Sequence, residues 1–545
     1  MPDQRPNILI MHTDQQRFDT LGALGGDHVV TPNMDRLSRQ GVTFARAYTS
    51  SPFCMPARHD FLTGTSARYH GYYQNQGTPI RDYGLSTLPR MLTEAGYQTM
   101  AVGKMHHYPE REHHGYNHMD LMEEIPASWE NDAYVQYLQT QGYDVRCEHG
   151  VRPIFYPVPQ ISRVPEAHHG SAWVATRTNE LLRRERTQPF FIFASWVGPH
   201  PPFYVPEKYL NLYADGISPD GTALPPSRLA PDQVRETDVP PEKDVTQRWV
   251  RRFKEGYFAR VTLIDTHVGR ILDTLEETGL LDNTLIIFMS DHGEMLGDRR
   301  HFSKTVPYEG SAHIPLIMAG PGVPGGMRAM TAVNTWDIAA TVLDAAAIEV
   351  PEDHPLIGES LLSLDWEDPD RIVITHLYEN ERRWIAAEMG DWKFIHFRRG
   401  GHEELYDLDA DPWEQQNLIG DDRYRDIADR LRRACLAFER NYGLEAGADA
   451  SGFVDLLDSD ETCERRVGWP FNWRQYPRWM NGYRDEDFTA ILQEMRDVLA
   501  SEEGAYIPTD EEWRERVLES WAAIGGDRGA LSAVLSEADA RRETG

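Results

Sequence analysis

Short apolar runs alternate with longer segments of helical periodicity over the first two-thirds of the chain. The runs predict buried strands at residues 7–11, 98–102, 190–196 and 284–290. Helices are predicted between the strands, at residues 32–40, 85–95, 171–184 and 249–277. Because strands that alternate with helices form parallel sheets with both faces covered, we expect an α/β fold with a large, mostly parallel sheet sandwiched by helices.

Residues with strong positional preferences mark the ends of several of these helices. Thr31 is predicted to be the N-cap residue of the first helix, Pro32 occupies its first position, and Gly41 follows its end. Gly96 and Gly279 end two later helices, and each leads directly into a predicted strand. The boundaries of the first helix are therefore the best defined.

The pattern changes near residue 365. Short, closely spaced apolar runs at residues 371–376, 384–388 and 392–397 predict an antiparallel sheet, and a helix is predicted near residues 423–440. We therefore expect a smaller C-terminal α+β subdomain with a helical tail. The predicted parts of the chain are residues 1–365, 366–440 and 441–545.

Composition narrows the class of protein. A chain of 545 residues with 40% hydrophobic content is expected to be globular and to contain more than one structural unit. Its formal net charge of −31 disfavours nucleic acids and anionic membranes as partners. The N-terminus lacks an apolar signal core, and the four cysteines are widely scattered, as is typical of reduced thiols. The sequence thus predicts a cytoplasmic protein that binds neither nucleic acid nor membrane.

Polar side chains follow the predicted strands at the positions where each strand ends. They are Asp14, Gln15, Lys104, His106, His200, Asp291 and His292. Ligands of open α/β sheets bind beyond the carboxyl ends of the strands. We therefore expect metal ligands and cationic side chains to meet at one edge of the sheet.

The segment Cys-Met-Pro-Ala-Arg at residues 54–58, followed by Thr63 and Gly64, resembles the sequence by which type I sulfatases have a cysteine oxidised to Cα-formylglycine. Further segments extend the resemblance, to sulfatases of the alkaline phosphatase superfamily, over residues 7–440. They are Gly-Lys-Met-His at 103–106, Pro-His-Pro at 199–201, Asp-His-Gly at 291–293 and Glu-Leu-Tyr-Asp-Leu at 404–408, with Asp-Pro-Trp-Glu at 411–414. The resemblance makes residues 1–365 a catalytic domain.

The resemblance implies a metal site with one divalent cation. Its ligands would be Asp14, Gln15, Asp291, His292 and the formylglycine made from Cys54. Many arylsulfatases have Asp at the position of Gln15 and Asn at that of His292, so two carboxylates replace three. Oxygen ligands suit Ca²⁺, whereas an imidazole ligand favours Mn²⁺, and both metals stay open.

The resemblance also assigns catalytic roles. Lys104 and Lys304 would contact sulfate oxygens, and His200, with Lys304, would protonate or shield the departing alcohol. Arg58, one helical turn from Cys54, would orient the aldehyde hydrate. His106 would remove the proton from its second hydroxyl, so that sulfate is expelled and the aldehyde regenerates.

Three functions are compared. The first is hydrolysis of an organic sulfate monoester to an alcohol and inorganic sulfate, after maturation by a formylglycine-generating enzyme. The alternative is a phosphonate monoester or phosphodiester hydrolase with the same site, which Gln15 and His292 favour, whereas Lys104 and His106 favour a sulfatase. The third is a non-catalytic binding protein, which the intact Cys54 and ligand positions disfavour. Aryl, saccharide and choline sulfates all stay open as substrates.

Two further segments, apart from His106, and the single residue His313 have no assigned place in this chemistry. The histidines at positions 106, 107, 113, 114 and 118 fit no tight ligand motif, so we expect a loop over an anionic substrate and not a second metal site. His313 stands where relatives often have Arg, and the sequence assigns it no role. The acidic tail at 441–545, with its Trp-rich segment 469–479, is predicted to form a subunit contact of a homo-oligomer or to cap the active site.

Overall fold

The computed structural model describes residues 5–75, 84–107, 110–124, 126, 129–143, 159–162, 164–228, 247–378, 383–443 and 447–454, together with 529 and 532. Most of the predicted tail at 441–545, including its Trp-rich segment, lies outside these residues, so its predicted roles are untested. Among the helices that the structure describes, none is both long and apolar enough to cross a bilayer.

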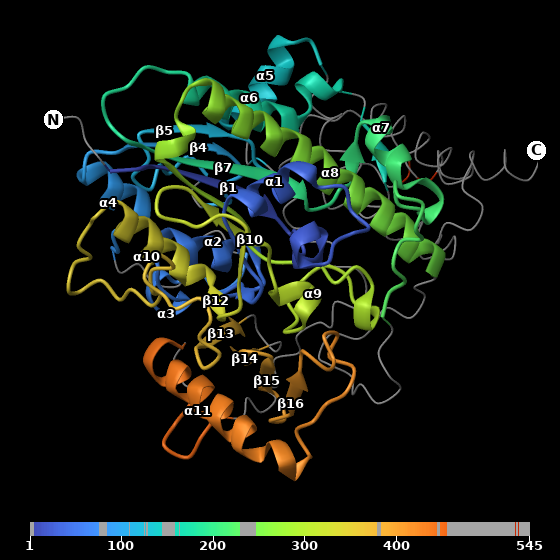
Figure 1. Cartoon of the computed structure of the whole chain (residues 1–545), viewed down its shortest axis with the longest axis vertical. Coiled ribbons are helices and arrows are strands. Elements are labelled where there is room, and N and C mark those ends of the chain that lie inside the picture. The colour runs from blue at the N-terminus through green and yellow to red at the C-terminus, as the bar shows by residue number, and fades with distance from the viewer. Residues whose placement is uncertain are drawn as a thin grey trace, which may run out of the picture.

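The main sheet has eight strands in the order β11-β2-β10-β9-β1-β7-β4-β5 (Figure 1). The strands are β1 (Asn7–Asp14), β2 (Val42–Phe44), β4 (Gln98–Gly103), β5 (His118–Leu121), β7 (Phe190–Pro199), β9 (Thr284–Ser290), β10 (Leu316–Ala319) and β11 (Met327–Ala329). Strand β10 runs antiparallel to its neighbours β9 and β2, and the other pairs are parallel. The expected α/β fold with a mostly parallel sheet is confirmed.

Helices cover both faces of this sheet (Figure 1). On one face lie α1 (Pro32–Gln40), α5 (Ala133–Thr140), α6 (Gly170–Leu182) and α8 (Gln247–Glu277), and on the other α2 (Cys54–Thr63), α4 (Leu88–Glu94) and α10 (Thr335–Ala345). Smaller elements are α3 (Ala67–His70), α7 (Glu207–Leu210), α9 (Glu309–Ala312), β3 (Ala47–Tyr48), β6 (Gln160–Ile161), β8 (Tyr204–Val205) and β12 (Val333–Asn334). The predicted helix at 85–95 begins later, at Leu88, because Thr87 caps it.

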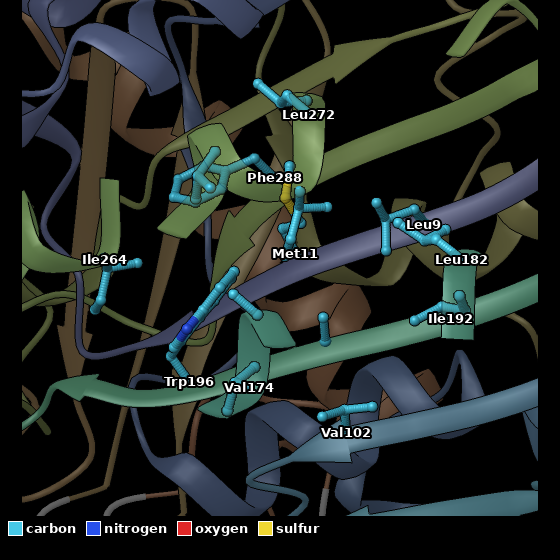
Figure 2. Packing of buried hydrophobic residues seen from close by; sticks show 14 of the residues in the cluster. Leu9, Met11, Val102, Val174, Leu182, Ile192, Trp196, Ile264, Leu272 and Phe288 are labelled. Atoms are coloured by element: carbon cyan, nitrogen blue, oxygen red, sulfur yellow. The ribbon is translucent and has the colours of Figure 1, made fainter. Parts of the chain in front are cut away.

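The central strands are apolar at nearly every position because each of their faces contacts a different helical layer. Successive side chains of a strand point to opposite faces. In β1, Leu9 and Met11 pack in the cluster below α6 and α8, whereas Ile8 and Ile10 pack in the cluster of the opposite face. Figure 2 shows Met11 close to Phe288 of β9, and Leu9 close to Leu182 of α6, in the first cluster. This packing fixes the strands whose ends carry the site.

A second, antiparallel sheet forms the C-terminal part, as predicted. Its strands are β13 (Ile372–Leu377), β14 (Trp384–Met389), β15 (Trp392–Phe397) and β16 (Glu403–Asp407), in this order. Helix α11 (Arg425–Tyr442) covers one face, with Leu431 and Cys435 packed among Ile385 and Phe394. Cys54 and Cys435 are free thiols. The domain limits at residues 365 and 440 stay predictions.

Buried polar contacts join this second sheet to the main domain. The ammonium group of Lys393, in β15, is fully buried and lies 3.0 Å from Glu309 Oε1 and 3.1 Å from Glu414 Oε1. The indole Nε1 of Trp384, in β14, donates a hydrogen bond of 3.1 Å to the carbonyl oxygen of Thr305. These buried polar contacts therefore fix the position of the second sheet against the main domain.

Thr31 is the N-cap residue of α1, as predicted, but its side chain does not supply the capping hydrogen bond. Its hydroxyl donates to the carbonyl of Thr20 instead. Asp265, in α8, supplies the cap: its carboxylate accepts hydrogen bonds from Asn33 N at 3.0 Å and Met34 N at 2.7 Å. A residue more than two hundred positions away replaces the local one, because the two helices pack together.

Replacement of Asp265 by Ala should destabilise the protein, because it leaves the buried amide groups at the start of α1 without acceptors. We expect a loss of about 1–3 kcal/mol in the free energy of unfolding, measured by urea denaturation. D273A, which removes an exposed carboxylate of the same helix, is the matched control and should change it by less than about 0.5 kcal/mol. Equal losses in both variants would contradict the capping role.

Candidate active site

The ends of β1 and β9 and the start of α2 bring four predicted residues together. Asp14 ends β1, Asp291 and His292 follow β9, and Cys54 is the first residue of α2. One ligand atom from each of the four lies within 4.8 Å of the others, and all four side chains are buried. Within the described part of the chain, no other group of three or more His, Cys, Asp or Glu side chains has this geometry.

The donor atoms of this group fit a divalent cation. Asp14 Oδ1 is buried and has no hydrogen-bond partner among the described residues. His292 Nε2 lies 3.9 Å from that oxygen, 3.6 Å from Asp291 Oδ1 and 3.2 Å from Cys54 Sγ. Two carboxylates and an imidazole that face one point are ligands that Ca²⁺ or Mn²⁺ accepts. A bound cation would satisfy the unpartnered carboxylate oxygen.

Gln15 is held tightly at the rim of this group. Its backbone has a φ of 69°, in the left-handed region, and its amide donates to Asp291 Oδ1 at 3.0 Å. The side-chain oxygen accepts a hydrogen bond of 2.5 Å from Lys304 Nζ, and Nε2 donates to Glu294. The structure therefore brings Gln15 to Lys304, and its role as a metal ligand stays a prediction.

Arg58 ties the two carboxylates to each other. It lies on α2, and it donates from Nε to Asp291 Oδ2 at 2.9 Å and from Nη2 to Asp14 Oδ2 at 3.0 Å. Nη1 donates to the carbonyl of Lys104 and to Ser195 Oγ. Burial acts to lower the pKa of Arg58, but Asp291 and Asp14 raise it above its ordinary value. The guanidinium thus stays charged between the carboxylates.

The two predicted lysines lie on either side of this group. The Lys104 side chain is fully buried, and its ammonium lies 2.6 Å from Asp14 Oδ2 and 2.9 Å from Glu124 Oε2. Burial acts to lower the pKa of Lys104, but Asp14 and Glu124 raise it. Burial also acts to lower the pKa of Lys304, but Cys54 and Asp14 raise it. Both side chains are therefore cations, and their contact with a sulfate stays a prediction.

The predicted histidines approach from two further strand ends. His200, after β7, donates its backbone amide to the Asp14 carbonyl at 3.0 Å, and its Nδ1 lies 2.7 Å from the carbonyl of Pro201. Burial lowers the pKa of His200 to about 3. His106, after β4, has a left-handed φ of 55°, and its buried Nδ1 has no hydrogen-bond partner among the described residues. Burial, followed by Lys104, lowers the pKa of His106.

Three histidines outside the site contact one another through their rings. His107 and His114 meet edge to face with ring centroids 4.7 Å apart, and His59 joins them at 5.2 Å from His107. None belongs to the group with metal-ligand geometry.

His313 makes structural contacts near the second sheet. Its Nδ1 lies 2.7 Å from Glu309 Oε2, and its ring stacks on Phe18 with ring centroids 3.8 Å apart. It therefore packs at the interface with the second sheet.

The sequence analysis missed two carboxylates, Glu123 and Glu124. They follow β5, which lies beside β4 at the edge of the sheet. Glu123 accepts hydrogen bonds from the backbone amides of Met105 and His106, and Glu124 contacts Lys104. Their position directly after a strand could have identified them. However, β5 has no continuous apolar run, so the sequence did not predict that strand.

The unmodified Cys54 thiol is a poor nucleophile at this position. Burial first, and then Asp14, raise the pKa of Cys54 to about 11. Because the thiolate and not the thiol attacks electrophiles, a cysteine in this environment is unreactive near neutral pH. The arrangement around position 54 therefore does not suit direct thiol chemistry.

Comparison with known proteins places the chain in a family of esterases. Residues 6–348 match the family "Sulfatase", and residues 297–441 match "N-sulphoglucosamine sulphohydrolase, C-terminal". The chain belongs to the sulfatase family and is a sulfuric ester hydrolase. This confirms the resemblance found in the sequence to type I sulfatases.

Individual relatives span most of the chain. An arylsulfatase of Clostridium perfringens is 33% identical over 463 residues, which cover 79% of this chain and 93% of the relative. A choline-sulfatase of Rhizobium meliloti is 31% identical over 439 residues, covering 78% and 84%. The crystal structure of a phosphonate monoester hydrolase of Agrobacterium radiobacter has a TM-score of 0.67 at 24% identity, covering 83% of this chain and 99% of that one. The last comparison shows a shared fold.

Divalent metal should stabilise the protein through Asp14, Asp291 and His292. We expect the melting temperature of chelator-treated protein to rise on addition of Ca²⁺ or Mn²⁺. At a metal concentration of 100 Kd the free energy of unfolding should increase by about 2.7 kcal/mol. D291N should lose the gain, whereas D282N, which changes an exposed carboxylate, should keep it. Equal gains in both variants would contradict the assignment.

The same gain should depend on pH in a fixed direction. Burial, together with the neighbouring charge of Asp14, raises the pKa of Asp291 to about 7. Below that pH the carboxyl group of the metal-free protein is protonated, so metal must displace a proton in order to bind. Metal affinity should therefore fall as the pH is lowered from 8 to 6, in a titration followed by the same melting shift.

Proposed function

We propose that this protein hydrolyses an organic sulfate monoester to an alcohol and inorganic sulfate, with a formylglycine made from Cys54 as nucleophile. The observation that carries the proposal is the convergence of Cys54 with Asp14, Asp291 and His292 at one point, with ligand atoms within 4.8 Å. Arg58, Lys104 and Lys304 surround that point with positive charge. Although the chain has a net negative charge, positively charged side chains lie around the point where an anionic ester would bind.

Two groups complete the site. A divalent cation, Ca²⁺ or Mn²⁺, held by Asp14, Asp291 and His292, with Gln15 at the rim, would supply a Lewis acid for a sulfuryl oxygen and for the nucleophile. The aldehyde at position 54 would supply a hydrate with two hydroxyls, one to attack sulfur and one for the later release of sulfate. Conversion of Cys54 requires a formylglycine-generating enzyme as a maturation partner.

The chain's own residues bind and orient the ester. Lys104 and Lys304 place two ammonium groups against the non-bridging sulfuryl oxygens of the ester, and their preorganised positions lower the barrier as negative charge develops on the leaving oxygen. Arg58 keeps the two ligand carboxylates and the start of α2 in register. Arg58 and Lys104 are buried and Lys304 is partly buried, so their electrostatic effect on the reaction is stronger than in water.

Two histidines are assigned to proton transfer. His200 Nδ1 faces the carbonyl of Pro201 and so carries one proton. A second proton, held on Nε2 when the negative charge of a bound ester favours the imidazolium against burial, is the one that passes to the departing alcohol. His106 has a pKa lowered mainly by burial, and a neutral imidazole suits the base that deprotonates the second hydroxyl. The substrate can be an aryl, saccharide or choline sulfate. The cytoplasmic location and the homo-oligomer stay predictions.

Conversion of Cys54 is the first test. The peptide that carries residue 54, from protein produced with the maturation enzyme, should be lighter by about 18 Da than the cysteine form. C54A should lower kcat/KM for a sulfate ester by at least about 1,000-fold, because it removes the nucleophile. C435A, which removes the other buried free thiol, is the control and should keep full activity if it folds. Active protein with an unmodified thiol at position 54 would contradict the proposal.

The alternative is hydrolysis of phosphonate monoesters or phosphodiesters at the same site. The neutral pair Gln15 and His292 favours it, because this pair also occurs in phosphonate monoester hydrolases. Lys104 and His106 favour the sulfatase. We expect kcat/KM for 4-nitrophenyl sulfate to exceed that for a phenyl phosphonate ester by at least about tenfold, a difference of about 1.4 kcal/mol in activation free energy. A preference in the opposite direction would favour the alternative.

A further inference from the structure

Glu124 is a carboxylate in the site that the proposed reaction does not use. It follows β5, and only 12% of its side chain is exposed. Its Oε2 accepts a hydrogen bond of 2.9 Å from Lys104 Nζ, and its Oε1 lies 3.6 Å from His200 Nδ1. The carboxylate therefore lies between two proposed active-site residues that come from different strands, β4 and β7.

Neutralisation of Lys104 alone does not explain this carboxylate. The Lys104 ammonium already lies 2.6 Å from Asp14 Oδ2, which is closer than Glu124. A further buried negative charge also opposes the binding of an anionic ester, because like charges repel strongly where water is excluded. A second function is needed to account for Glu124. Its carboxylate charge, 3.6 Å from the His200 Nδ1 that hydrogen-bonds to Pro201, indicates one.

The backbone that carries Glu124 is fixed to the same loop as Lys104. The preceding residue, Glu123, donates its amide to Asp132 Oδ2 at 2.7 Å. The carboxylate of Glu123 accepts from the amides of Met105 and His106, both at 2.9 Å. The ends of β4 and β5 are thus joined by hydrogen bonds, so the backbone before Glu124 is fixed to the loop that carries Lys104.

We propose that Glu124 is a positioning residue that holds Lys104 and the His200 imidazole in register. Lys104 is assigned to the sulfuryl oxygens and His200 to the leaving oxygen, so both ends of one ester would meet their donors together. The inference rests on the proposed function. It implies that Glu124 matters most for esters whose leaving alcohol needs a proton.

The test compares two sulfate esters with different leaving groups. Nitrophenolate departs without a proton, whereas the alkoxide of a simple alkyl sulfate needs one. In E124Q the amide oxygen can still accept from Lys104, but the charge that faces His200 is gone. We expect kcat of E124Q for the alkyl sulfate to fall by about 30-fold and that for 4-nitrophenyl sulfate by less than about threefold. E124A should lower both, because it also releases Lys104.

Two controls separate positioning from a general structural effect. E130Q changes an exposed glutamate of the same segment and should match the wild type with both esters. The double variant E124Q/H200A should be no more than about twofold slower than H200A on the alkyl sulfate, because residues that act together are not additive. All variants should share the wild-type melting temperature and the same conversion of Cys54.

Three outcomes would overturn the inference. In the first, E124Q lowers kcat equally for both esters. In the second, the effect of E124Q on kcat adds fully to that of H200A. In the third, E124Q has the same kcat as E130Q with both esters. In each of these cases the active wild type keeps the proposed function intact. If converted wild-type protein hydrolyses neither sulfate, the proposed function fails, and the role of Glu124 fails with it.

Discussion

The structure of the site depends on one buried guanidinium between two carboxylates. Asp14 and Asp291 end adjacent parallel strands, so their charges would repel each other inside the protein. Arg58 donates to both, and their pKa values move apart: cations led by Lys104 lower that of Asp14 against burial, whereas burial and Asp14 raise that of Asp291. Because Arg58 lies one turn after Cys54, the same contacts fix the start of α2.

The contacts of Arg58 with Asp14 and Asp291 help to explain how a protein with a net negative charge could bind an anionic ester. The net charge of −31 is spread over the whole chain, and salt screens it beyond about 10 Å. Inside the site, the carboxylates are engaged with Arg58 and Lys104, and a divalent cation would add positive charge. Local preorganisation, and not the total charge, determines which substrate the site favours.

Sequence patterns predicted the parts of the fold where burial is symmetrical. The strands β1 and β9, covered on both faces, have continuous apolar runs, and the residues after them are those that meet in the site. Strand β5 lies at the sheet edge, and its half-buried, partly polar residues gave no run, so Glu124 was missed. The cap of α1 by Asp265 was also unpredictable, because it depends on how two distant helices pack.

The contact between Trp384 and Thr305 joins the C-terminal sheet to the loop that carries Lys304. Thr305 follows Lys304 directly and has a φ of 80°, a conformation that a β-branched residue adopts only when its surroundings impose it. The indole holds this strained carbonyl from one side, and the amide of Thr305 is bound to Pro52 from the other. The smaller sheet therefore supports the backbone next to Lys304, the cation proposed to bind the ester. Replacement of this sheet by another module would remove that support from the loop that carries Lys304.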